Sequence, residues 1–119
     1  MTYQQLVKKI NSAGAWFVGS FMGEFVINYP KFCNDSNRKA DFIDYIHNEY
    51  GKTLEYKYSS TKTKCNAIIS IIEAGKVREA MEFVLQTNDK KVIKESKENA
   101  QALLDAIEEG KIFLPDPVI

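Results

Sequence analysis

Residues 59–87 read SSTKTKCNAIISIIEAGKVREAMEFVLQT, and the rest of the chain is arranged around this segment. Apolar side chains recur at helical spacing on both sides of Gly75, first Cys65, Ile68, Ile69 and Ile72, then Val77, Met81, Val84 and Leu85. A Ser/Thr cluster before the first run can cap its free N–H groups. Because glycine adopts the left-handed conformation at little steric cost, Gly75 predicts a tight turn. The segment is therefore predicted to form a helical hairpin.

Length and composition predict one globular domain over residues 1–119. The chain has 119 residues, of which 45% are hydrophobic and 27% are charged, as in ordinary soluble proteins. Lysine plus arginine and aspartate plus glutamate both number 16, so no whole-molecule field draws the chain to nucleic acid or to a membrane. No apolar run of membrane-spanning length and no signal-peptide core occurs, and we expect a cytoplasmic protein without membrane contact.

Two helices are predicted at the start of the chain. Residues 3–12 place Leu6, Val7 and Ile10 on one face and end near Gly14. Residues 15–29 are ambiguous: phenylalanines repeat every four residues as in a helix, while two glycines weaken a helix by about 1 kcal/mol each. We favour a helix that ends at Tyr29–Pro30 over a hairpin of short strands. The glycines, at 19 and 23, would then permit close approach of a second helix.

Two further helices and one extended segment complete the chain. Residues 38–50 are predicted to form a helix with an apolar stripe of Phe42, Ile43 and Ile46. Asp35 or Ser36 would cap this helix, and Gly51 would end it. After the hairpin, Asn88 or Asp89 is predicted to cap a helix that runs to about Glu109, ends at Gly110 and turns inward a stripe of Ile93, Ala100, Leu103, Leu104 and Ile107. Residues 53–58 alternate like a strand and would pair with residues 111–114.

The predicted fold is therefore mainly α. It is a single-domain bundle of five to six helices, with at most a minor two-stranded β element of residues 53–58 and 111–114.

Catalytic chemistry has little support in the residues. His47 is the only histidine, so any nucleophile and base pair must use it. Asp44 and His47 share a helical face as half of a metal site, but no second half occurs, and we expect a rim histidine bonded to its helical neighbour. Cys33 and Cys65 lie far apart and are predicted to be buried free thiols. No phosphate-binding glycine motif is present. We predict no catalytic, cofactor or metal site.

One cluster has the composition of a contact surface. Lys52, Lys57, Lys62 and Lys64 alternate with tyrosines and hydroxyls, and only Glu55 opposes their charge. Lysines neutralise anionic groups and tyrosine rings give contact area at low entropic cost. We therefore predict partner-binding residues with exposed lysines, namely Lys52, Tyr56, Lys57, Tyr58, Lys62 and Lys64. A solvated loop with half-buried tyrosines would explain the same residues without a partner.

These observations favour a small non-enzymatic binding or regulatory protein that acts by protein–protein contact. An adaptor or an inhibitor of a larger machine, of the kind that phages carry, fits this class. The alternative is a nucleic-acid-binding protein that uses the tyrosine- and lysine-rich residues 50–64. An enzyme that uses His47 is the third hypothesis, with the weakest support.

Overall fold

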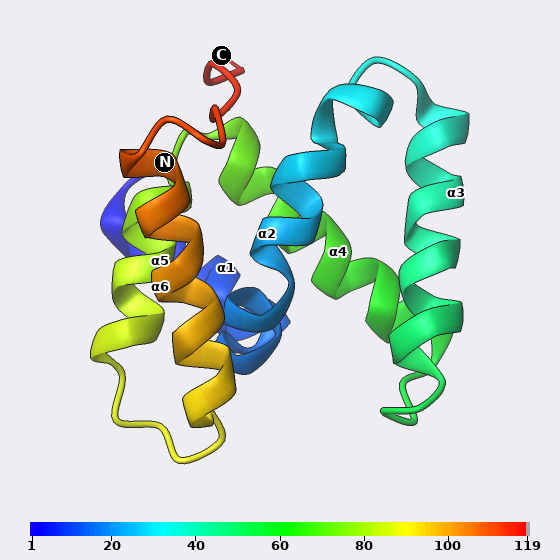
Figure 1. Cartoon of the computed structure of the whole chain (residues 1–119). Helices are drawn as coiled ribbons and strands as arrows, with labels where there is room; N and C mark the ends of the chain where they lie inside the picture. The colour runs from blue at the N-terminus through cyan, green and yellow to red at the C-terminus, as the bar shows by residue number, and fades with distance from the viewer. Residues whose placement is uncertain (119) are drawn as a thin grey trace.

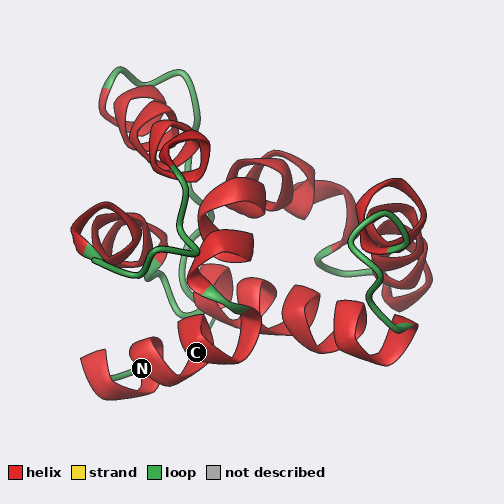
Figure 2. Ribbon diagram, turned by 90° about the horizontal axis from the view of Figure 1, so that it is seen from below, coloured by secondary structure: helices red, strands yellow, loops and turns green. Residues whose placement is uncertain are grey.

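The computed structural model describes residues 1–118 and confirms a mainly α fold. Figure 1 shows how the helices pack, and Figure 2 shows that helices and loops account for the described chain. In chain order the elements are α1 (Tyr3–Ala13), α2 (Ala15–Phe32), α3 (Ser36–Ile46), the π-helix η1 (His47–Gly51), α4 (Tyr58–Glu73), α5 (Val77–Gln86) and α6 (Lys94–Glu108). Within residues 1–118 no helix combines the length and the apolar composition needed to cross a bilayer.

Helix α2 is the central element of the fold, so the helix predicted for residues 15–29 is confirmed over the strand hairpin. It lies between α5 and α6 on one side and α3 on the other, while α4 crosses behind it (Figure 1). The phenylalanines that repeat every four residues along α2, Phe17, Phe21 and Phe25, are buried. The ring centroids of Phe17 and Phe21 are 4.7 Å apart, and Phe25 packs edge-on against Phe42 of α3 with 5.0 Å between the ring centroids. Because this helix is apolar on nearly every side, the packing around it decides its conformation.

The predicted end of α2 at Tyr29–Pro30 is wrong, because the helix continues through Pro30 to Phe32. A proline inside a helix removes one backbone hydrogen bond. Tertiary contacts on both sides of Pro30 offset this loss. The Tyr29 hydroxyl donates to Glu73 Oε2 at 2.9 Å, and the buried Phe32 ring stacks on Phe42 at 5.1 Å.

The hairpin of α4 and α5 is confirmed, with Gly75 at a φ of 71° between the two helices. The chain's last described residues fold back onto this turn. The Val118 N–H donates to the Glu73 carbonyl at 2.7 Å, and a Cβ on Gly75 would lie 2.7 Å from Pro117 Cγ. Within residues 1–118 there is no strand, so the predicted pairing of 53–58 with 111–114 is wrong. The tail instead packs across the hairpin turn.

Gly51 has a different role from the helix stop that was predicted. It closes the π-helix η1, and the chain continues in helical conformation to Lys52. A Cβ at Gly51 would lie 2.6 Å from His47 Nδ1 and 2.7 Å from Thr61 Oγ1. Because real Cβ contacts are not so short, glycine is needed here for the close packing of η1 on α4.

Helix α6 begins later than predicted, at Lys94, and neither Asn88 nor Asp89 caps it. The Asp89 carboxylate instead accepts the Lys91 N–H at 2.9 Å and so forms a local turn, which competes with helix capping. Ile93 occupies the N-cap position and is 49% exposed, so its predicted place in the core is wrong. The remaining stripe is buried or half-buried, and Gly110 follows the helix at a φ of 72°, as predicted.

Candidate functional site

The six residues predicted to bind a partner lie between η1 and the second turn of α4. We call them the lysine–tyrosine segment: Lys52, Tyr56, Lys57, Tyr58, Lys62 and Lys64. Three of its lysines, at 52, 57 and 62, are exposed as predicted, and Tyr58 is 43% exposed. Tyr56 and Lys64 are half-buried. The structure therefore brings the segment to the surface but divides it into an exposed part and a packed part.

Lys64 is bound inside the fold and is not exposed. Its Nζ donates to the backbone carbonyl of Ala13 at 2.8 Å and lies 5.0 Å from the ring centroid of Tyr56 and 5.9 Å from that of Phe17. Burial lowers the pKa of Lys64. The carbonyl of Ala13 belongs to the last turn of α1, where carbonyls lack helical partners. Lys64 thus fastens the end of α1 to α4.

The tyrosines of the segment also make internal contacts. The Tyr58 hydroxyl donates to Asp44 Oδ1 at 2.6 Å, and this hydrogen bond is the main reason that the pKa of Tyr58 is raised. The Tyr56 ring packs against Phe17 at 6.3 Å, and burial raises its pKa. The exposed lysines at 52, 57 and 62 are therefore the part of the segment that remains free for contact.

His47 contacts α4 and not its helical neighbour Asp44, so the predicted bond within the helix is wrong. His47 Nδ1 lies 2.8 Å from Thr61 Oγ1, and the imidazole packs edge-on against Tyr58 at 5.3 Å. Because Thr61 is fully buried, a substrate has no access to this hydroxyl. Cys65 is buried as predicted, whereas Cys33 is half-buried, and both are free thiols. No cluster of three metal-ligating side chains occurs among residues 1–118.

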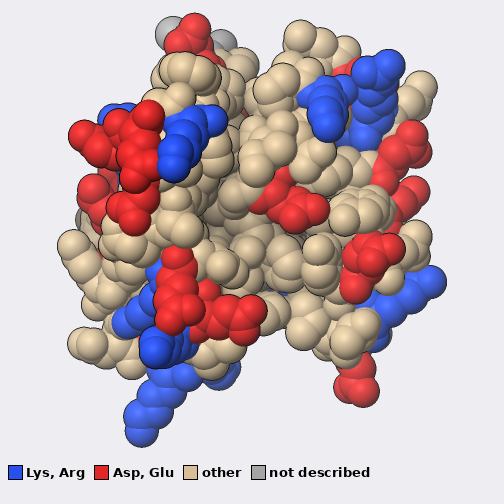
Figure 3. Space-filling model, viewed as in Figure 1, with Lys and Arg blue, Asp and Glu red and all other residues tan. Residues whose placement is uncertain are grey.

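A second surface was not predicted from the sequence. It is a groove of about 400 Å³ formed by the N-terminal half of α2, by η1 with the turn after it, and by the start of α6. We call it the acidic groove. Figure 3 shows a hollow on this face between α6 and α3, with acidic side chains around it. The groove is lined by Trp16, Ser20, Phe21, Glu24, Glu49, Tyr50, Thr53, Leu54, Ile93, Glu95, Ser96 and Asn99.

The wall of the acidic groove is aromatic. Trp16 meets Phe21 edge-on at 5.9 Å, and Phe21 packs against Tyr50 at 4.8 Å. Trp16 and Leu54 are half-buried, so each leaves part of its apolar surface to solvent. Gly23 of α2 does not line the groove, but it also faces open space, since a Cβ built there would meet nothing within 4 Å. The groove thus exposes apolar surface along α2.

The charged side chains that line the acidic groove are all negative. Glu24, Glu49 and Glu95 line the groove, each from a different element, and within residues 1–118 its lining includes no lysine, arginine or histidine. The Tyr45 hydroxyl donates to Glu24 Oε1 at 3.4 Å, and the charge of Glu24 is the main cause of the raised pKa of Tyr45. Negatively charged carboxylates therefore flank the apolar wall of the groove.

Trp16 and Leu54 separate this groove from a second cavity of about 550 Å³. That cavity is lined by Lys64 and Lys91 together with Asp89, so its charge is mixed. The acidic groove and this cavity of mixed charge therefore lie on opposite sides of the same two apolar side chains. The acidic groove and the lysine–tyrosine segment are distinct surfaces.

Sequence reasoning missed the acidic groove because its residues come from three distant segments, around 16–24, 49–54 and 93–99. Only one signal was available beforehand. Glu24 is the sole charged residue between Lys9 and Lys31, in the most apolar part of the chain. A lone carboxylate in such a segment must reach solvent or a partner, since burial of an unpaired charge is costly.

Comparison with known proteins gives no assignment. No protein-family model matches the chain, and no curated protein and no solved structure is significantly similar to it. Function therefore has to be inferred from the two surfaces.

Proposed function

We propose that this protein is a small non-enzymatic binding protein that acts in the cytoplasm by protein–protein contact, as an adaptor or an inhibitor of a larger assembly. The observation that carries the proposal is the acidic groove, with its aromatic wall of Trp16, Phe21 and Tyr50. Concave apolar surface with a polar rim is typical of sites that bind partners. Aromatic side chains are enriched in such contacts.

A second candidate is nucleic-acid binding through residues 50–64. The observation in its favour is the exposure of Lys52, Lys57 and Lys62 beside Ser59 and Ser60 in the first turn of α4. Lysines and hydroxyls near a helix N-terminus suit phosphate groups. Three lysines make a small footprint, however, and the rings of this region are largely engaged in packing. This is why we place it second.

The two candidates are separated by capture from extracts of the native host, performed with and without nuclease on the tagged full chain. Protein–protein contact predicts that a protein is retained in both conditions. Nucleic-acid binding predicts that capture is lost after nuclease treatment. It also predicts binding to heparin that weakens steeply as salt rises, because phosphate contacts release counterions.

A further inference from the structure

We infer, building on the proposed function, that the acidic groove receives a basic amphipathic helix of a protein partner. The apolar side chains of that helix would contact Trp16, Leu54 and Ile93. Its lysines or arginines would pair with the carboxylates of Glu24, Glu49 and Glu95. Insertion of an amphipathic helix into a groove is a common mode of peptide recognition, with anchors at positions i, i+3, i+4 and i+7.

Charge complementarity identifies the partner as basic. The chain has equal numbers of acidic and basic residues, so the acidity of the groove is local. Among the described residues, the ion pairs are Arg38–Asp35, Lys94–Glu98 and Lys111–Glu109, and none includes a groove glutamate. Three like charges around one apolar surface repel each other, and cations of a partner would relieve that repulsion. An acidic partner or a nucleic acid would add to it.

Ile93 places an apolar side chain on the rim of the groove, at a helix N-cap where a polar residue is usual. It occupies the N-cap of α6 with the extended backbone typical of that position, φ −74° and ψ 165°, and it makes no capping hydrogen bond. Serine, threonine, aspartate or asparagine is strongly preferred there. Isoleucine instead leaves helix N–H groups without a cap and is 49% exposed. Its exposed side chain adds apolar surface to the lining of the groove.

The shape of the groove suits a helix lying along α2. The start of α6 and η1 form its two sides, and α2 contributes the small side chain of Ser20 to the lining. Farther along α2, Gly23 leaves open space, whereas Gly19 is covered by Ser96 and Val84. Small residues on a helix permit close approach of another helix. Within α2, Gly19 already packs against α5 and α6, whereas a Cβ at Gly23 would meet no atom of the described residues within 4 Å.

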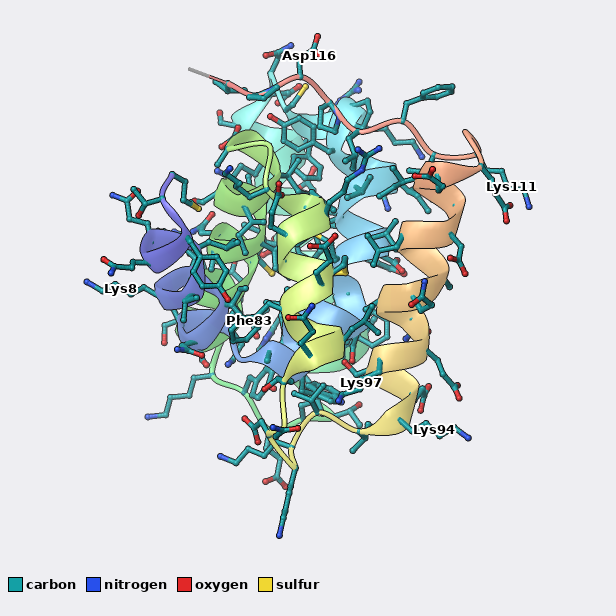
Figure 4. All side chains as sticks on the ribbon, turned by 90° about the vertical axis from the view of Figure 1, so that its left-hand side faces the viewer. Lys8, Phe83, Lys94, Lys97, Lys111 and Asp116 are labelled. Atoms are coloured by element: carbon teal, nitrogen blue, oxygen red, sulfur yellow. The ribbon has the colours of Figure 1, made fainter. Side chains whose placement is uncertain are left out.

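The lysines at the start of α6 do not neutralise the groove. In Figure 4 the labelled Lys94 points away from the body of the protein, and Lys97 lies near the loop between α5 and α6. Lys94 Nζ pairs with Glu98, and Lys97 Nζ donates to the Thr87 carbonyl at 2.8 Å. Both lysines are thus engaged on α6 or its loop, and neither lines the groove next to Glu95.

The test uses the chain's single tryptophan, which lines the groove, as a fluorescence reporter. The probe is a tryptophan-free helical peptide of roughly 16 residues, with leucines at i, i+3, i+4 and i+7 and lysines elsewhere. We expect a saturable change in Trp16 emission. Glu49→Lys with Glu95→Lys should weaken binding by about tenfold or more. The matched control, Glu82→Lys with Glu108→Lys, makes the same charge change at exposed sites outside the groove and should retain affinity within about twofold.

One further protein variant and one further peptide test whether the attraction is specific. Glu49→Gln with Glu95→Gln removes charge without adding any, and its affinity should fall between those of wild type and the lysine pair. A peptide with glutamates in place of lysines should not bind. Circular dichroism melts confirm that each variant is folded before titration.

The inference is overturned if the wild type gives no saturable change, or if the groove pair and the control pair lose affinity equally. Its failure is distinguishable from failure of the proposed function. Nuclease-resistant capture of a host protein without peptide binding would remove the groove assignment and leave the binding function. Absence of both peptide binding and nuclease-resistant capture would overturn both the groove assignment and the proposed function.

Discussion

The ammonium group of Lys64 donates a hydrogen bond to the carbonyl of Ala13, 51 positions earlier in the chain, at 2.8 Å. This contact ties the end of α1 to α4 and adds two aromatic neighbours, Phe17 and Tyr56. A residue expected to be exposed on a contact surface is therefore part of the packing. Its assignment as a partner-binding residue stays a prediction, whereas the exposure expected for it is wrong.

Replacement of Lys64 by methionine should lower the free energy of unfolding by about 1–3 kcal/mol, because the Ala13 carbonyl loses a charged donor. Lys62→Met is the matched control and should change it by less than about 0.5 kcal/mol, since Lys62 is exposed. Urea unfolding monitored by circular dichroism measures both values. Equal effects of the two substitutions would show that Lys64 does not hold α1.

The two glycines of α2 should respond in opposite directions to alanine. A Cβ at Gly19 would lie 2.5 Å from Ser96 Oγ and 2.7 Å from Val84 Cγ1, so Gly19→Ala should cost about 1–3 kcal/mol through overpacking. A Cβ at Gly23 meets nothing within 4 Å, so Gly23→Ala should stabilise the fold by up to about 1 kcal/mol through helix propensity. Thermal melts of both variants test this. A stabilised Gly19→Ala protein would contradict the packing of α2 on α6.

These glycines also show which parts of the fold could be predicted from the sequence. The periodic apolar pattern predicted the helices, and the four-residue spacing of Gly19 and Gly23 suggested close helix approach, which occurs at Gly19. Helix ends were harder, because they depend on tertiary contacts. Pro30 stays helical owing to the packing of Tyr29 and Phe32, and Asp89 forms a turn of its own.

The candidate surfaces divide in the same way. The lysine–tyrosine segment is contiguous in sequence and could be found by composition. The acidic groove brings Glu24, Glu49 and Glu95 together only through the packing of α2, η1 and α6. No local pattern encodes that proximity. The apparent core stripe even assigned Ile93 to the interior, since spacing alone does not show that α6 begins at Lys94.

The two cysteines should differ in reactivity. Burial raises the pKa of the Cys65 thiol to about 12, so at about pH 8 it is protonated as well as inaccessible. Cys33 is half-buried. Ellman's reagent should therefore label Cys33 in the native protein and label both thiols in denaturant. Cys33→Ala provides the control and should leave no rapidly reacting thiol. Rapid labelling of Cys65 in that variant would contradict its burial.

The same burial predicts a loss of stability in alkali. The pKa of Cys65 is about 12 in the folded state against 9.0 for an unperturbed thiol, so above pH 9 the unfolded chain releases a proton that the folded chain keeps. The free energy of unfolding attributable to Cys65 is therefore constant below pH 9 and falls as pH rises from 9 to 12. The measurement is the difference in the free energy of unfolding between wild type and Cys65→Ala, so that the contributions of all other groups cancel. Its independence from pH would contradict the assignment.

Ile93→Asp should stabilise the protein although it removes an apolar side chain. The backbone at Ile93 already has N-cap geometry, so an aspartate side chain can accept a helix N–H and contribute about 0.5–2 kcal/mol. Ile93→Ala lacks the acceptor and serves as the control. A higher melting temperature is expected for the aspartate variant alone. If alanine and aspartate give the same melting temperature, α6 does not begin where the structure places it.

Capture of host proteins by three forms of the chain, all after nuclease treatment, tests whether this protein works by protein contact through the acidic groove. The forms are wild type, Glu49→Lys with Glu95→Lys, and Lys57→Glu with Lys62→Glu. We predict that the wild type and the variant of the lysine–tyrosine segment retain the same protein and that the groove variant loses it. Retention by the groove variant together with loss by the lysine variant, or no nuclease-resistant capture by the wild type, would contradict this account.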